Sequence, residues 1–205
     1  MAARRHRRTV SRRAVVERKT AETKISLALD LDGRGKSRIA TSMPFLDHML
    51  TVMAKHGFMD LTVRASGDLD VDAHHTVEDL GIVFGQALKR ALGERIGIRR
   101  FGAAAVPMDE SIARVTVDCS GRPYLVYRIA LATRKIQSFD TELVEHFLEA
   151  VTVHAGMTVH VEVPYGKNAH HMLEASFKAF GRALDEATRL DPRVAGVPSS
   201  KGRLE

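Results

Sequence analysis

The chain has 205 residues, of which 44% are hydrophobic and 27% charged, values typical of a globular protein large enough to bury its own core. It contains one cysteine, which excludes an internal disulfide framework and a Cys-x-x-Cys site. No apolar stretch approaches the roughly 18 residues needed to span a bilayer, so we expect a soluble, cytoplasmic protein without a membrane partner.

The first 13 residues are strongly basic, with six arginines and no acidic residue. Outside them Lys+Arg equal Asp+Glu, so the formal net charge of +6 belongs to this tail. The favoured interpretation is a solvated, disordered tail over residues 1–14, because nothing apolar anchors it. Contacts with phosphates and an organellar presequence are the alternatives.

Residues 15–100 are expected to form the first of two similar α+β halves. Alternating strands on both sides of a turn predict a hairpin, and apolar residues at three- and four-residue steps after His74 predict an amphipathic helix. The predicted elements in chain order are strands at 23–32 and 36–41, a helix from Pro44 to Gly57, a strand at 60–65, and a helix from His74 to Gly93.

Residues 101–190 repeat this order. The sequence AHHTVE at 73–78 recurs 96 residues later as AHHMLE, and Glu22 aligns with Glu110 at an offset of 88. The predicted strands lie near 112–119, 124–130 and 157–163, and the predicted helices near 140–154 and 170–190. The expected fold is therefore α+β, with two duplicated ββαβα-type half-domains, each a small sheet with helices on one face. Residues 191–205 form a closing tail.

The duplicated His-His-x-x-Glu motif predicts a site for two metal ions. Residues four apart share a helix face, so His74 and Glu78 can hold one ion, whereas the adjacent His74 and His75 point about 100° apart. His48 and His146 occupy matching places on the preceding helices. The candidate ligands are His48, His74, His75, Glu78, His146, His170, His171 and Glu174. This mixed N/O set suits Mn, Fe, Co or Zn, whereas structural zinc more often uses cysteine.

Several other interpretations of the sequence are weaker. The segment 68–72 resembles the start of a calcium loop, but Ala73 stands where that loop needs glycine. The same clusters would also suit a metal-binding protein without catalytic activity or a two-metal hydrolase, and both interpretations remain open. A nucleic-acid partner is not expected, because the excess charge lies in the tail and aromatic residues make up only 5% of the chain.

From about residue 15 onward, the chain resembles the imidazoleglycerol-phosphate dehydratase family. The blocks that carry the resemblance are 18–23, 45–49, 72–79, 120–124, 170–178 and 198–202. The resemblance implies the conversion of imidazole glycerol phosphate, a phosphorylated imidazole, to imidazole acetol phosphate by loss of water, in histidine biosynthesis. It also implies two Mn²⁺ ions per active site and a homo-oligomer of twenty-four subunits with active sites between subunits.

The same resemblance implies roles for individual residues. It groups His48, His75, His170 and Glu174 around one ion, and His74, Glu78, His146 and His171 around the other. It makes Glu22 the acid/base residue in contact with the substrate. The phosphate-binding set that it implies is Arg100, Arg122, Lys178, Ser199, Ser200 and Lys201, with His56 also lining the site. The tail at 191–205 would therefore contact the substrate.

Overall fold

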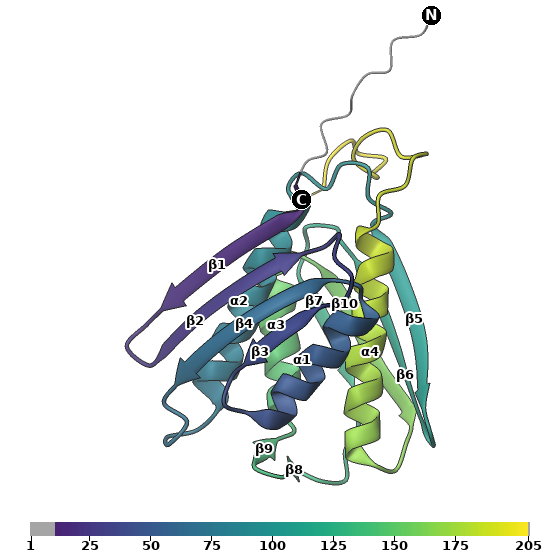
Figure 1. Cartoon of the computed structure of the whole chain (residues 1–205). Helices are drawn as coiled ribbons and strands as arrows, with labels where there is room; N and C mark the ends of the chain where they lie inside the picture. The colour runs from purple at the N-terminus through teal and green to yellow at the C-terminus, as the bar shows by residue number, and fades with distance from the viewer. Residues whose placement is uncertain (1–10, 205) are drawn as a thin grey trace, which may run out of the picture.

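The computed structural model describes residues 11–204. The first half contains β1 (Arg13–Lys19), β2 (Thr23–Asp30), β3 (Ser37–Ala40), α1 (Pro44–His56), β4 (Asp60–Gly67) and α2 (His74–Leu92). The second half contains β5 (Phe101–Met108), β6 (Ser111–Asp118), β7 (Tyr124–Arg128), β8 (Lys135–Ile136), β9 (Phe139–Asp140), α3 (Leu143–Ala155), β10 (Thr158–Tyr165) and α4 (Ala169–Thr188) (Figure 1).

The two halves have the same sheet topology. The first sheet has the strand order β1-β2-β4-β3 and the second has the order β5-β6-β10-β7. In each sheet the last pair is parallel, β3 with β4 and β7 with β10, and the other neighbours are antiparallel. The expected fold class, two duplicated α+β halves, is confirmed. The short β8–β9 hairpin occurs only in the second half of the described chain.

Each half begins with a strand that the sequence analysis did not predict, β1 in the first half and β5 in the second. In β1 only Ala14 and Val16 are buried, while Val15 is 64% exposed, so this edge strand lacks a clear hydrophobic signal. Strand β1 begins at Arg13, so the predicted tail ends before residue 13 and not at residue 14. Arg12 is buried and pairs with Asp32. The rest of the predicted tail, residues 1–10, lies outside the described residues.

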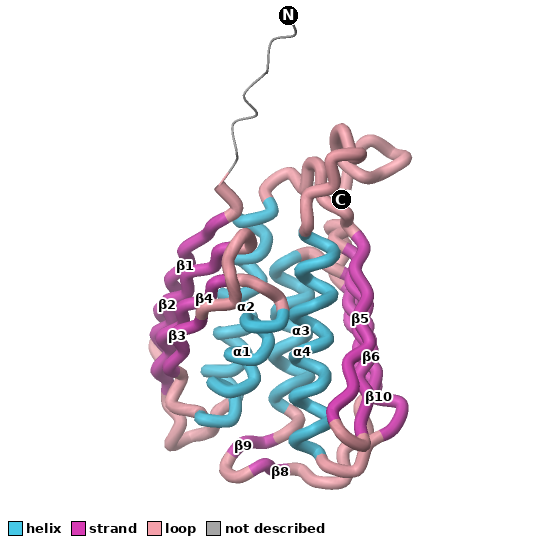
Figure 2. Tube along the Cα trace, turned by 45° about the vertical axis from the view of Figure 1, so that its right-hand side comes forward, coloured by secondary structure: helices cyan, strands magenta, loops and turns pink. Residues whose placement is uncertain are grey.

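The helices lie between the two sheets, so each sheet has helices on one face only (Figure 2). Helix α2 packs on β1 and β2, and α4 packs on β5 and β6. Across the halves, α2 packs against α3 and α1 packs against α4. Among the described residues no helix is long and apolar enough to cross a membrane.

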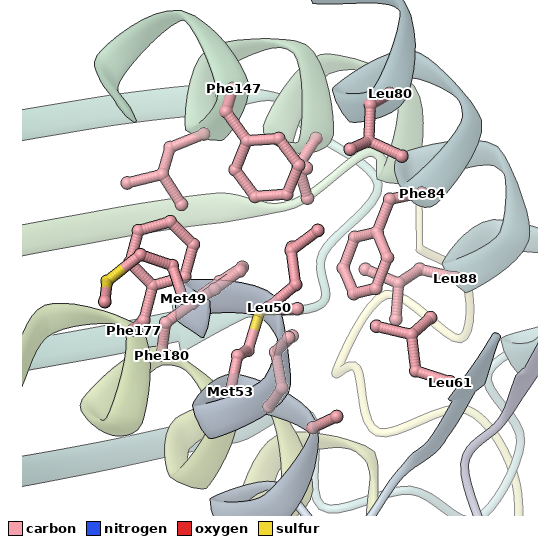
Figure 3. Close-up of a cluster of buried hydrophobic side chains, with 14 of the residues drawn as sticks. Met49, Leu50, Met53, Leu61, Leu80, Phe84, Leu88, Phe147, Phe177 and Phe180 are labelled. Carbon is pink, nitrogen blue, oxygen red and sulfur yellow. The ribbon is translucent and has the colours of Figure 1, made fainter. Parts of the chain in front are cut away.

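One hydrophobic core joins the two halves. Its fully buried side chains come from all four helices and include Met49, Leu50, Phe84, Phe147 and Phe180 (Figure 3). The two repeats therefore share a single core. This packing fixes the positions of α1 to α4, the helices that carry the duplicated histidines.

Glycine allows the helices to approach one another closely. A Cβ atom added to Gly181 of α4 would lie 2.3 Å from the carbonyl oxygen of Met53 in α1. A Cβ atom on Gly81 of α2 would lie 2.7 Å from the Cβ atom of Ala150 in α3. Larger side chains at these positions would push the helices and their histidines apart.

Candidate active site

A first group of candidate ligands, here called the His48 cluster, consists of His48 from α1 with His170 and Glu174 from α4. The Nε2 atoms of His48 and His170 lie 3.1 Å and 3.0 Å from the same Glu174 oxygen, Oε2. The three ligand atoms lie within 4.8 Å of one another, a spacing that fits a shared cation. Asn168 caps the helix by accepting a hydrogen bond from the backbone N–H of His170, which fixes the first turn of α4.

The Glu174 carboxylate is ionised in this cluster. Burial opposes its ionisation, but hydrogen bonds from Lys178 and His48 lower the pKa of Glu174 to about 2. The second carboxylate oxygen, Oε1, lies 2.6 Å from the Lys178 ammonium group. Oε2, which contacts both histidines, is therefore the oxygen that a cation in this cluster could bind.

A second group, the His74 cluster, consists of His74 and Glu78 from α2 and His146 from α3. The rings of His74 and His146 have their centroids 4.7 Å apart, and His74 Nε2 lies 3.9 Å from Glu78 Oε2. These residues are the repeat counterparts of the His48 cluster. His146 on α3 corresponds to His48 on α1, and His74 and Glu78 on α2 correspond to His170 and Glu174 on α4. The cluster is looser than the first, but its nitrogen and oxygen donors are of the same kind.

The remaining two histidines turn away from their neighbours. The ring planes of His74 and His75 stand at 85°, as do those of His170 and His171. Each half therefore points one histidine into a cluster and the other elsewhere. Within one chain, the structure does not bring His75 to the His48 cluster, whose ligand atoms group only with one another.

Each outlying histidine has a carboxylate partner. His75 Nδ1 lies 3.1 Å from Asp68 Oδ2, and His171 Nδ1 lies 2.8 Å from Glu110 Oε2. The hydrogen bond that His75 donates to Asp68 raises the pKa of His75, and the one that His171 donates to Glu110 raises the pKa of His171. Neither carboxylate was predicted from the sequence to be a site residue.

Glu22 lies in the turn between β1 and β2, next to His75. Its carboxylate oxygen Oε2 is 3.7 Å from His75 Nδ1, and its side chain is 55% exposed. The hydroxyl oxygen of Thr20 accepts hydrogen bonds from the backbone N–H groups of Glu22 and Thr23, at 3.1 Å and 2.9 Å. The turn is thus ordered while the carboxylate itself stays accessible.

A buried carboxylate ties this turn to α2. Asp79, adjacent to Glu78 in the sequence, accepts a hydrogen bond from the Thr23 hydroxyl at 2.5 Å and one from Arg18 Nε at 2.7 Å. Asp79 and Thr23 are both buried. One helix therefore carries a candidate ligand and, one residue later, the anchor of the Glu22 turn.

Arg100 connects the start of β5 to the C-terminal tail. Its Nε and Nη2 atoms donate to the two carboxylate oxygens of Asp118, at 2.7 Å and 3.1 Å, and its Nη1 atom donates to the carbonyl oxygen of Pro198 at 2.9 Å. This contact secures the segment that carries Ser199, Ser200 and Lys201. The hydrogen bond to Asp118 raises the pKa of Arg100, which stays charged.

The other members of the phosphate-binding set lie on different elements. Lys178 contacts the His48 cluster through Glu174. Burial, followed by the charge of Lys178, lowers the pKa of His56 at the end of α1. Arg122 is exposed in the loop after Ser120, and its carbonyl oxygen accepts a hydrogen bond from the Thr158 hydroxyl. Within one chain the set is therefore distributed between the His48 cluster, this loop and the tail.

Four carboxylates around the site were missed as functional residues: Asp68, Asp79, Glu110 and Asp118. Only Glu110 carried a usable signal, because the repeat aligns it with Glu22. Asp68 stood in the segment that was rejected as a calcium loop. The other two lie beside Glu78 and before Cys119, with nothing in the local pattern to mark them.

Fold and site together define a duplicated α+β protein with two related histidine–carboxylate clusters. The model of the family described as imidazoleglycerol-phosphate dehydratase matches residues 41–184. The chain belongs to this family of histidine-biosynthesis enzymes.

Similar proteins agree with this assignment over nearly the whole chain. The imidazoleglycerol-phosphate dehydratase of Geobacter metallireducens is 60% identical over 95% of this chain and 100% of its own length, and that of Acetivibrio thermocellus is 57% identical over the same shares. The crystal structure of the Staphylococcus aureus dehydratase superposes with a TM-score of 0.79, at 40% identity, and covers 87% of this chain and 99% of that chain. The Pyrococcus furiosus structure also gives 0.79, at 36% identity, over 92% and 100%.

Proposed function

We propose that this chain removes water from imidazole glycerol phosphate to give imidazole acetol phosphate, using two Mn²⁺ ions per active site. The observation that carries the proposal is the convergence of the His48 and His170 Nε2 atoms on one oxygen of Glu174. The His74 cluster contains the repeat-related donors in a looser arrangement, with His74 Nε2 3.9 Å from Glu78 Oε2. Imidazole nitrogens and an ionised carboxylate, without thiolate, suit Mn, Fe, Co or Zn, and the resemblance to the dehydratase family implies Mn²⁺ among them.

Each group of residues has a distinct task. The bound ions would act as Lewis acids toward the imidazole ring of the substrate. Glu22, half exposed and 3.7 Å from His75, would take the proton from the substrate carbon and pass it to the side-chain hydroxyl, which leaves as water. The remaining N–H groups of Arg100, with the fork of Arg122, would hold the phosphate at the other end of the substrate.

The remaining members of the phosphate set close the site from two sides. Arg100 holds Pro198, and therefore the tail at 191–205 would present Ser199, Ser200 and Lys201 to the phosphate. Lys178 would contribute its charge beside the His48 cluster, with His56 lining the site.

We further propose that two copies of the chain complete each site. The His48 cluster offers three ligands that lie together, with His75 outside it in one chain, and His171 pairs with Glu110; both observations support a fourth ligand supplied by another subunit. The shell of twenty-four subunits expected for the family would provide such contacts. A cytoplasmic location stays a prediction, as does the absence of nucleic-acid and membrane partners.

The reaction and the metal requirement are tested together. Protein stripped with a chelator is assayed for dehydration of imidazole glycerol phosphate before and after addition of Mn²⁺. We expect activity to vanish on stripping and to return with the metal. Bound metal with no dehydration under either condition would favour a two-metal hydrolase or a metal-storage protein instead.

The shared site is tested by mixing two inactive variants. His48→Ala removes a ligand from one side of the proposed interface and His75→Ala removes one from the other side. If subunits mix at random, about a quarter of the sites combine an intact His48 with an intact His75, and activity returns to that extent. Mixing His48→Ala with Glu174→Ala, which damages the same side, serves as the control and should stay inactive. No recovery in the first mixture would contradict a site shared between subunits.

A further inference from the structure

The two hairpin glutamates, Glu22 and Glu110, occupy equivalent places in the repeat but have opposite surroundings. The Glu22 carboxylate makes no hydrogen bond with the described residues and is 55% exposed. The Glu110 carboxylate is fully engaged. Its Oε1 accepts hydrogen bonds from the backbone N–H groups of Lys167 and Asn168, at 3.0 Å and 2.7 Å, and its Oε2 lies 2.8 Å from His171 Nδ1.

Loop length explains the difference. In the first half, the loop between β4 and α2 supplies Asp68, which lies 3.1 Å from His75 Nδ1. In the second half, the corresponding loop between β10 and α4 is only Gly166-Lys167-Asn168 and contains no carboxylate. The nearest carboxylate to His171 is therefore the hairpin residue Glu110.

We infer that Asp68 and Glu110 are positioning residues that hold His75 and His171 with Nε2 directed at the metal, and that Asp68 thereby leaves Glu22 free for the substrate. The inference rests on the proposed two-metal site. A carboxylate accepts the Nδ1–H proton of a neutral imidazole, so the lone pair of that ring lies on Nε2. The repeat has thus divided two tasks that a single hairpin glutamate cannot perform at once.

The substitution Glu110→Gln separates this role from a structural one. The glutamine oxygen can still accept from the N–H groups of Lys167 and Asn168, so the hairpin and the start of α4 keep their contacts. These two donors also fix the orientation of the amide, whose NH₂ group must then face His171 Nδ1. Because that NH₂ group donates to Nδ1, it favours the His171 tautomer that carries its proton on Nε2. A protonated Nε2 has no lone pair with which to bind a metal ion.

The test is a titration of chelator-stripped protein with Mn²⁺, with free Mn²⁺ followed by electron paramagnetic resonance. We expect wild type to bind two ions per subunit and Glu110→Gln to bind one of the two about 10–100-fold more weakly. Glu22→Gln should bind both ions as wild type does. Asp68→Ala, which leaves His75 Nδ1 without its acceptor, should weaken one ion, and Asp70→Ala, at an exposed neighbour in the same loop, is the matched control and should bind both normally.

The possible outcomes distinguish this inference from the proposed two-metal site on which it rests. Two ions bound by Glu110→Gln and Asp68→Ala with wild-type affinity would overturn the positioning role and leave the two-metal site intact. Wild-type protein that binds no Mn²⁺ would overturn both. If Glu110→Gln does not assemble, the same titration of Asp68→Ala decides the question through His75.

Discussion

Asp79 should be needed for catalysis although it contacts neither the metal nor the substrate. It anchors the Glu22 turn through Thr23 and Arg18. The second repeat has Ala175 in the equivalent position of α4, so alanine is compatible with the helix there. Asp79→Ala therefore removes the anchor without introducing a residue that the fold rejects.

The expected loss of stability follows from the two hydrogen bonds. A hydrogen bond to a charged group contributes about 1.5–3 kcal/mol. The Arg18 side chain is 37% exposed and can turn to water, so its share is small. The buried Thr23 hydroxyl loses its charged acceptor, but Thr20 Oγ1, at 3.1 Å, partly replaces it. We expect unfolding to become easier by about 2 kcal/mol.

The effect on turnover should exceed the effect on stability. A displacement of about 1 Å at a reacting group can lower the rate by about 10²-fold. Apart from the 3.7 Å pair between Glu22 and His75, the Glu22 turn has no other described polar contact with α2. The assays are urea unfolding at equal subunit concentration, the Mn²⁺ content, and kcat of the manganese-loaded enzyme. Asp79→Asn keeps an acceptor for Thr23 and should lie between wild type and Asp79→Ala. A wild-type kcat in Asp79→Ala would refute this reasoning.

Three further outcomes are expected. Glu22→Gln should lower kcat strongly with unchanged manganese content, and full turnover would remove Glu22 from the mechanism. Burial raises the pKa of Cys119 to about 12, so the thiolate forms only at strongly alkaline pH. A disulfide reagent at pH 8 should therefore react only after denaturation, and rapid labelling of the folded protein would contradict this. Gly181→Ala should cost about 1–3 kcal/mol in urea unfolding because its Cβ meets the Met53 carbonyl, and unchanged stability would show that α1 and α4 can move apart.

The amino-acid sequence by itself determined the repeat, the central helices and the candidate metal ligands. The pattern around His74 and Glu78 could be interpreted locally, because helical spacing alone decides which residues share a face. The 85° between the ring planes of His74 and His75 agrees with that expectation. The edge strands β1 and β5 were missed because their outward faces weaken the hydrophobic alternation that marks a strand.

Only the tertiary structure decided which carboxylates support the site. Asp68, Asp79 and Glu110 act across 7, 56 and 61 residues of sequence, so their partners depend on loop lengths and on the packing of α2 and α4. The alignment of Glu22 with Glu110 gave no sign that one is free and the other bound. That difference arises because a longer loop brings Asp68 to His75, while a three-residue loop leaves Glu110 as the carboxylate that contacts His171 Nδ1.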